Sequence, residues 1–389
     1  MSPDAIVLDA DQRSALAIVR SLGSRGLKVW ATAGRQGPLA GASRWCPKTV
    51  LIPDPKHCAR SFVEAVLDLI VAHPKAIVFP VTDASITALT AHPGIPYERI
   101  ACAPAGAYDT LSDKASLVEL ARKIGVRVPP TRIASGRNDL ERTITAAEEP
   151  VVLKPARSWY LHAGALHNTS VFIAQTRAAA RAYAEKQAWV DHVPCLVQRY
   201  VEGSGAGIFT FYAEDKPLTW FSHRRLREKP PSGGVSVLSE SSPVDARLQA
   251  MSSGLFDAAN WFGPAMAEFR IAPNGESYLM EVNGRFWGSL QLAIDSGVDF
   301  PWMLYQSMTG QSVEPISAYT SGRRLRWLLG DFDSLLLTLR QPERSMRSKL
   351  ESLARFATLF SRSTRFEVLR WSDPRPFFRE AKLWIKALR

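Results

Sequence analysis

The first hundred residues alternate short apolar runs with helical patterns, and this alternation constrains the fold more than any other feature of the sequence. Spans suited to strands and helices follow one another at residues 5–8, 13–23, 29–32, 62–72 and 76–81. Strands separated by helices form a parallel sheet with helices on its faces. We therefore expect an N-terminal α/β domain over residues 1–110. Residues 9–13 after the first strand lack the G-x-G-x-x-G pattern of dinucleotide sites, so NAD binding is not expected.

Length and composition exclude several classes of protein. The chain has 389 residues, of which 46% are apolar and 22% charged, close to the average for soluble globular domains. The longest apolar runs, such as residues 76–81, fall far short of the roughly 20 residues that a membrane-spanning helix needs. Four cysteines stand apart with no C-x-x-C pair, and the N-terminus has no signal-peptide pattern. We expect a cytoplasmic protein without disulfides.

The positive charge is concentrated at the C-terminus. Residues 323–389 contain 16 Lys or Arg against 7 Asp or Glu, which accounts for 9 of the 11 net positive charges. The nearly neutral remainder is unlike a nucleic-acid-binding protein, so no nucleic acid partner is expected. We expect residues 319–389 to form a basic helical extension whose helices cap the body. The alternative is attachment of the extension to an anionic membrane surface. The oligomeric state is left open.

Two further domains are expected between these ends. Ser112 is a candidate N-cap for a helix that runs to about Ile124, and residues 151–155, 177–189 and 195–201 suggest a strand, a helix and a strand. Residues 111–200 would then form a small α+β lobe. Strand patterns dominate residues 201–318, at 207–212, 218–222, 265–272 and 277–282, and predict a lobe built on an antiparallel sheet.

The most informative stretch for function is residues 265–285. Asn274 and Gly275 lie between two alternating runs, which is typical of a tight hairpin turn. A turn centred on these two residues places Glu268 directly opposite Glu281 on one face of the sheet.

Two facing carboxylates repel each other unless a positive charge lies between them. A Mg²⁺ ion meets this need, since it prefers oxygen ligands completed by phosphate and water. The alternation places Arg270 and Asn283 on the same face, and Arg285 two residues further along could neutralise a phosphoryl group. The alternative is a solvent-exposed hairpin in which Glu268 pairs with Arg270 or Arg285.

Two lysines favour a nucleotide site. Lys154 follows a buried apolar run, where an ammonium group needs an anion. Lys114 lies in the first turn of a predicted helix, an unfavourable end for a cation unless a phosphate approaches. The alternative for each lysine taken alone is a solvated surface residue. Residues 203–207 have G-x-G-x-G spacing, but an alternating run follows instead of a helix. We interpret them as a linker whose extended backbone could bond an adenine edge. The alternative is a plain strand connection.

In this order the residues resemble the ATP-grasp superfamily, from about residue 1 to residue 310. The resemblance implies ATP with two Mg²⁺ ions, or Mn²⁺ in their place, between two lobes. It implies that Lys114, Lys154 and the hinge Gln198, Tyr200, Val201 and Glu202 bind ATP, that Glu268, Glu281 and Asn283 bind metal, and that Arg285 contacts phosphate. Many members carry proline where Gly284 stands, a more glycine-rich loop after the second lysine, and an acidic residue shortly after the hinge.

Residues 223–236 combine clustered cations with a glycine-rich turn, and we interpret them as a loop. Together with residues 286–289 they resemble the uncharacterised carboxylate-amine ligase subgroup of the ATP-grasp superfamily. Arg225 and Arg227 would hold the substrate carboxylate or the acyl phosphate. The alternative is a basic surface loop.

The sequence therefore predicts an ATP-dependent ligase that joins a carboxylate to an amine through an acyl phosphate, with release of ADP and phosphate. Positioning and charge neutralisation would supply most of the catalysis. His223 is a candidate base for the amine. The alternatives are a small-molecule kinase and a catalytically inert nucleotide-binding protein. The identities of the acid and the amine are left open.

Overall fold

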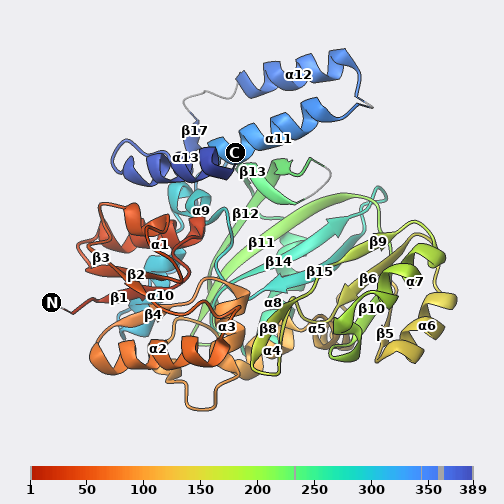
Figure 1. Ribbon diagram of the computed structural model, residues 1–389, viewed down its shortest axis with the longest axis horizontal. Coiled ribbons are helices and arrows are strands. Elements are labelled where there is room, and N and C mark those ends of the chain that lie inside the picture. The colour runs from red at the N-terminus through yellow and green to blue at the C-terminus, as the bar shows by residue number, and fades with distance from the viewer. Residues whose placement is uncertain (1, 232–233, 343, 358–362, 388–389) are drawn as a thin grey trace.

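The computed structural model describes residues 2–231, 234–342, 344–357 and 363–387. It has the predicted mixed architecture, with a parallel sheet of four strands, an antiparallel sheet of four strands and a mostly antiparallel sheet of seven strands. In Figure 1 the N-terminal domain lies to the left, the largest sheet in the centre, a small lobe to the right and the C-terminal helices at the top.

The N-terminal domain is a parallel sheet of four strands in the order β3-β2-β1-β4, with helices on both faces. Its elements are β1 (Ala5–Val7), α1 (Arg13–Gly23), β2 (Val29–Ala33), β3 (Lys48–Leu51), α2 (Ala59–Ala72), β4 (Ile77–Phe79) and α3 (Asp83–Thr90). Ala5 and Val7 face the core that contains α1, whereas Ile6 and Leu8 face the core that contains α2 and α3. The sequence did not reveal β3, because this edge strand is partly exposed and only two of its four residues are apolar.

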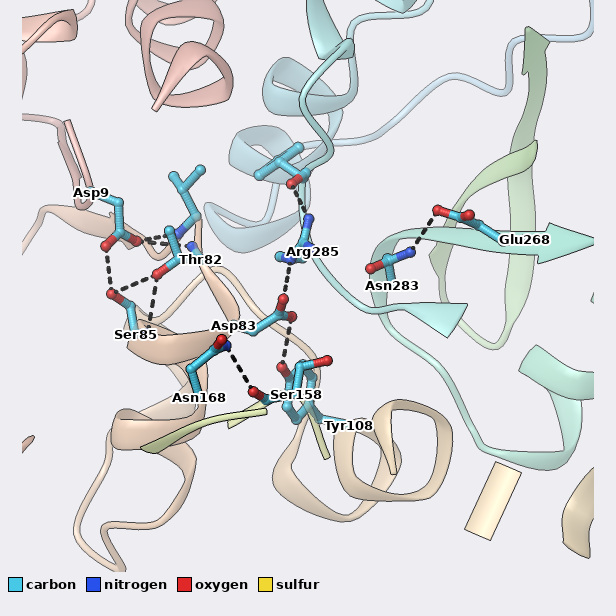
Figure 2. Close-up of polar contacts among 12 residues, drawn as sticks. Asp9, Thr82, Asp83, Ser85, Tyr108, Ser158, Asn168, Glu268, Asn283 and Arg285 are labelled. Atoms are coloured by element: carbon cyan, nitrogen blue, oxygen red, sulfur yellow. Dashed lines mark hydrogen bonds and ion pairs between the residues drawn. The ribbon is translucent and has the colours of Figure 1, made fainter. Parts of the chain in front are cut away.

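A carboxylate of the chain itself accepts hydrogen bonds at the N-terminus of α3. The carboxylate of Asp9, which follows β1, accepts hydrogen bonds from the backbone amides of Val81 (3.0 Å) and Thr82 (2.9 Å) and from the Ser85 hydroxyl (2.7 Å) (Figure 2). A helix N-terminus at a strand end is where a parallel α/β domain often binds phosphate. Here Asp9 occupies that position.

The small lobe is an antiparallel sheet in the order β5-β10-β6-β9 with helices on both faces. Its elements are α5 (Lys114–Lys123), β5 (Thr131–Ala134), α6 (Arg137–Thr145), β6 (Val151–Pro155), the hairpin β7 (Trp159–His162) and β8 (Ala165–Asn168), β9 (Phe172–Ala174), α7 (Arg177–Glu185) and β10 (Cys195–Arg199). The predicted helix to Trp189 ends at Glu185, because a separate short turn buries Trp189 and Val190.

The prediction that Ser112 is the N-cap of α5 is wrong. Ser112 is the last residue of α4 (Ala105–Ser112), and Asp113 caps α5 by accepting hydrogen bonds from the amides of Ala115 (3.0 Å) and Ser116 (3.1 Å). Both Ser and Asp are good caps, so local sequence did not distinguish them. Lys114 is therefore the first residue of its helix.

The large lobe is a sheet of seven strands in the order β15-β14-β11-β12-β13-β16-β17. The strands are β11 (Ser204–Ala213), β12 (Lys216–Lys229), β13 (Val235–Ser242), β14 (Gly263–Ile271), β15 (Ser277–Asn283), β16 (Arg324–Arg326) and β17 (Thr364–Phe366), with α8 (Ala246–Ala258), α9 (Leu290–Ser296) and α10 (Phe300–Met308). Helices α4, α5 and α8 cover one face, while α1, α9 and α10 pack over part of the other.

Two segments expected to be irregular are strands. Ser204 to Gly207, interpreted as a linker, begin β11 and pair with β14 from Ile271 to Glu268. Glycine is depleted in strands, which hid this one; a Cβ on Gly207 would lie 2.8 Å from Met266 Cε, so the flexible end of that side chain would have to shift. The expected basic loop 223–236 is mostly the hairpin of β12 and β13. Residues 232–233 of that loop lie outside the described part of the chain.

The C-terminal extension is not purely helical. It contains α11 (Leu328–Arg340), α12 (Met346–Ala357) and α13 (Arg375–Ala387), but β16 and β17 add to the large sheet. In the described part of the chain, no helix is both long and apolar enough to cross a membrane.

A buried ion pair joins the extension to the N-terminal domain. Arg20 of α1 donates through Nε to Asp373 (2.9 Å) and through its other nitrogens to the carbonyls of Glu367 (2.9 Å), Val368 (2.8 Å) and Asp373 (3.0 Å). The Asp373 carboxylate also accepts from the Ser43 hydroxyl at 2.7 Å. The two ends of the chain are thus held together.

Replacing Asp373 with Ala should destabilise the protein by about 3–5 kcal/mol, because Arg20 would remain buried without its anion. Denaturant unfolding measures the loss. Glu64→Ala is the matched control, since it breaks an exposed pair with Arg60 (2.9 Å) on α2 and should change stability by less than about 0.5 kcal/mol. Equal stability of the two variants would contradict a structural role for the Arg20–Asp373 pair.

Candidate functional site

The two predicted carboxylates face each other on neighbouring strands. Glu268 of β14 pairs directly with Glu281 of β15, and Met266 pairs with Asn283. The turn differs from the expected one: it spans Ala272 to Glu276, which alone would shift the register by one residue. A β-bulge at Met280 restores the predicted register at the site.

Cations and an amide surround Glu268. Arg225 of β12 lies 3.1 Å from its carboxylate, and the Asn283 side-chain amide donates to it at 3.1 Å (Figure 2). Arg270 instead donates to the carbonyl of Gly203. Burial raises the pKa of Glu268, and the nearby charge of Glu281 raises it further.

Glu281 is held by lysines of the small lobe. Lys154 of β6 is buried, its Nζ donates to the carbonyl of the bulge residue Met280 at 2.6 Å, and it forms an ion pair with Glu281 at 3.8 Å. Burial opposes ionisation of Glu281, but the charges of Lys154 and Lys114 outweigh it and lower its pKa. The bulge thus fixes the register and also presents a carbonyl to Lys154.

Lys114 lies in the same region. Its Nζ donates to Ser158 at 3.1 Å, and both residues line a small cavity with Glu281 and Asn283. The segment after Lys154, expected as a loop, forms the hairpin β7–β8 and packs against α3 through Trp159. The structure therefore brings together both lysines and both carboxylates from separate elements.

The Gln198 side chain points elsewhere. It is buried, donates to the Thr131 hydroxyl at 2.8 Å and lines a cavity on the small lobe with Arg122 and Pro130. Tyr200, Val201 and Glu202 follow β10 and lead into β11. None of the four predicted hinge residues lines the two described cavities that contain Lys114, Glu268 and Glu281.

Arg285 is positioned by the N-terminal domain. Its Nε donates to Asp83 at 2.8 Å, and the other Asp83 oxygen accepts from the Tyr108 hydroxyl at 3.3 Å (Figure 2). Burial opposes the charge of Arg285, but Asp83 outweighs this and raises its pKa. Arg285 lines a cavity of about 310 Å³ together with Arg225, Glu268 and Glu281.

Both arginines predicted to hold a carboxylate line a cavity of about 370 Å³ beside α11, but only one of them reaches the cavity of about 310 Å³. Arg225 lines this cavity, whereas Arg227 pairs with Asp331 of α11 and does not line it. The reason is a bulge at Leu226, which breaks the two-residue alternation that the prediction assumed. Arg224 pairs with Glu240 on β13, also away from Glu268.

Sequence reasoning missed Arg13, which lines the same cavity from the first residue of α1. It pairs with Glu367 and lies over the ring of Trp327 at 3.8 Å. The argument that singled out Lys114, a cation at a helix N-terminus, applies equally to Arg13 and would have found it.

His223 and Trp287 bring polar atoms to the cavity wall. Both side chains are buried, and neither His223 Nδ1 nor Trp287 Nε1 has a hydrogen-bond partner among the described residues. The other ring nitrogen of His223 lies 2.9 Å from the Ser289 hydroxyl. Burial, and next the charge of Arg225, lower the pKa of His223 to about 3, so its imidazole is neutral at pH 7.

A scan against protein-family models and a search of curated proteins found no match to the sequence. Solved structures match the fold. A biotin carboxylase of Campylobacter jejuni matches with a TM-score of 0.62 and 14% identity, over 83% of this chain and 74% of that one. An L-amino acid ligase of Bacillus licheniformis matches with a TM-score of 0.58 and 16% identity, over 81% of this chain and 79% of that one.

An N5-carboxyaminoimidazole synthetase of Staphylococcus aureus, complexed with ADP, matches with a TM-score of 0.62 and 13% identity, over 83% of this chain and 82% of that one. The chain has the ATP-grasp fold. Within the ATP-grasp fold of this protein, Gly284 is required by packing, because a Cβ there would lie 2.5 Å from the ring of Trp261.

Acid should destabilise the protein through His223. The unfolded chain takes up a proton near the usual pKa of 6.5, whereas the folded chain does so only near pH 3, so stability falls as the pH drops between these values. Thermal unfolding across this pH range should show that His223→Gln loses less stability at low pH than the wild type does.

The comparison between variants is needed because burial raises the pKa of Glu380 to about 7, which gives the opposite slope between pH 4.5 and 7. That contribution is shared by both proteins and cancels in their difference. Parallel stability profiles of the two proteins would show that His223 is not a buried neutral imidazole.

Proposed function

We propose that the protein is an ATP-dependent ligase that activates a carboxylate as an acyl phosphate and joins it to an amine, with release of ADP and phosphate. The supporting observation is the convergence of Glu268 and Glu281 with Lys154, Lys114 and Arg225 at one place. These groups come from both lobes of an ATP-grasp fold, and their charges suit the binding of a polyanion beside a cation.

The donor set fits Mg²⁺. Two carboxylates and the Asn283 amide oxygen are a partial ligand set of the kind that nucleotide phosphates and water complete. The described residues contain no group of three or more His, Cys, Asp or Glu that could hold a metal alone. Glu268, Glu281 and Asn283 would therefore hold an ion that binds together with the nucleotide. When bound, this ion would neutralise charge on the transferred phosphoryl group.

The chain's own cations would position the reacting groups. Lys154 and Lys114 are the proposed ligands of phosphate oxygens, and their low exposure strengthens such contacts. Tyr200, Val201 and Glu202 are the proposed adenine contacts, through their backbone. Arg285, fixed by Asp83, would stabilise the phosphoryl group during transfer.

The acid would bind in the cavity of about 310 Å³ that Arg225 lines. Arg225 and Arg13 are the proposed carboxylate ligands, and the unpartnered nitrogens of Trp287 and His223 supply further hydrogen-bonding groups. A pKa of about 3 makes His223 a poor base at neutral pH, so the geometry favours a binding role over the expected proton transfer.

Glu281→Gln should abolish ATP turnover while preserving the fold, because the change removes one charge but keeps the shape of the side chain. ADP release measures turnover, and circular dichroism checks the fold. Glu276→Gln, on the same hairpin but in the turn, is the matched control and should keep wild-type turnover. Normal ADP release by folded Glu281→Gln would rule out the metal assignment.

Arg225→Ala should lower the specificity constant for the acid by about tenfold to a hundredfold and should weaken ATP binding much less, because a charge-assisted bond to the acid contributes roughly 1.5–3 kcal/mol. Arg224→Ala is the control, since Arg224 lies one residue away and pairs with Glu240.

Screening pairs of acids and amines for ADP release, followed by mass spectrometry of the product, supplies the assay. An amide product separates the ligase from a kinase. Equal loss in both variants would contradict the placement of the acid at Arg225.

A further inference from the structure

The outer side of α12 carries a row of exposed apolar side chains. Met346, Leu350, Leu353 and Ala357 follow one another at spacings of four, three and four residues, which places them on one side of a helix. Met346 is 71% exposed, Leu350 58% and Leu353 42%, and Ala357 is also exposed. We call these four residues the α12 stripe.

A different side of α12 attaches the helix to the body. The Phe356 ring packs edge-on against Phe332 of α11 with centroids 6.1 Å apart, and the Phe356 carbonyl accepts from Arg326 at 3.1 Å. Ser352, one turn earlier, is half-buried on the same side. This attachment side lies roughly a third of a turn from the α12 stripe. Packing of α12 on α11 therefore does not account for the apolar character of the stripe.

Positive charge borders the stripe. Arg347 and Lys349 lie on its two flanks, and α12 contains one further cation, Arg355, against a single carboxylate, Glu351. Residues 323–389 as a whole contain 9 of the 11 net positive charges of the chain. Long Lys and Arg side chains beside an apolar row can reach anionic groups while their stems cover apolar surface.

The helix α13 has a similar two-sided pattern. Phe378 is 67% exposed and Ile385 50%, at a spacing that places them on one side, with Lys382 between them. Trp384 points inward and donates to Asp333 of α11 at 2.8 Å. In Figure 1, α11, α12 and α13 lie together at the top of the molecule, at the end remote from α2 and the small lobe.

We propose that the α12 stripe is a membrane-binding surface that inserts into the interfacial region of an anionic lipid bilayer. A helix with an apolar row flanked by cations is suited to lie in the plane of such an interface. A stable protein interface buries roughly 800 Å² on each partner, far more than a row of four side chains offers. Lipid is therefore the better match in both charge and size, and this inference does not depend on the proposed ligase activity.

The test is co-sedimentation of the full chain with vesicles of phosphatidylcholine alone or mixed in equal parts with phosphatidylserine. We expect binding to the anionic vesicles, weakened by salt, and little binding to the neutral ones. The triple variant M346S/L350S/L353S should lose at least about tenfold in affinity, because the inserting side chains are removed. The variant R347Q/K349Q should lose roughly fivefold per cation on anionic vesicles only.

The matched control is L51S/V71S, which replaces exposed apolar residues of the N-terminal domain and should bind as the wild type does. Leu51 is 52% exposed and Val71 80%, and the replaced α12 side chains are exposed too, so all variants should melt like the wild type. Absence of binding to anionic vesicles, or equal binding by the triple variant, would overturn the proposal. Self-association of the wild type in sedimentation velocity, lost in the triple variant, would also overturn it and identify a second copy as the partner.

Discussion

The repulsion between Glu268 and Glu281 is the constraint on which the site depends. Two carboxylates placed opposite each other across antiparallel strands require positive charge nearby. Arg225 supplies it from β12, which lies two strands from β14 in the sheet, and Lys154 supplies it from the small lobe. One electrostatic requirement therefore joins three parts of the chain, and it leaves the site suited to a metal ion that arrives with phosphate.

The C-terminal extension contributes to this site indirectly. Glu367 pairs with Arg13 and Asp373 with Arg20, both on α1, so the segment after β17 fixes the helix that brings Arg13 to the acid cavity. Asp331 of α11 similarly removes Arg227 from the cavity by pairing with it. The extension thus helps decide which arginines face the reacting groups. Its outer surface, on α12, is separate from these contacts.

Several features of the site were predictable because they depend on local periodicity. The alternation in β14 and β15 was enough to pair Glu268 with Glu281, and the apolar run ending at Lys154 placed that lysine at the end of a buried strand. Other features depend on irregularities that no short pattern reveals. The bulge at Leu226 left Arg227 outside the acid cavity that Arg225 lines, and the bulge at Met280 compensated for a turn of unexpected length. The glycines of residues 203–207 concealed a strand, because glycine is depleted in strands and carries no side chain to show the alternation.

By itself, the sequence determined the order of the α/β domain, the two lobes and the basic C-terminus, and it determined the chemical character of the candidate ligands. Periodicity and residue type are local properties, so they can be read from the sequence without knowledge of the fold. The tertiary structure alone decided that Asp83 orients Arg285, that Arg13 joins the acid cavity, that Gln198 turns away from it and that the α12 stripe faces outward. Each of these outcomes depends on contacts between residues far apart in the chain, and such contacts exist only once the domains have packed against one another.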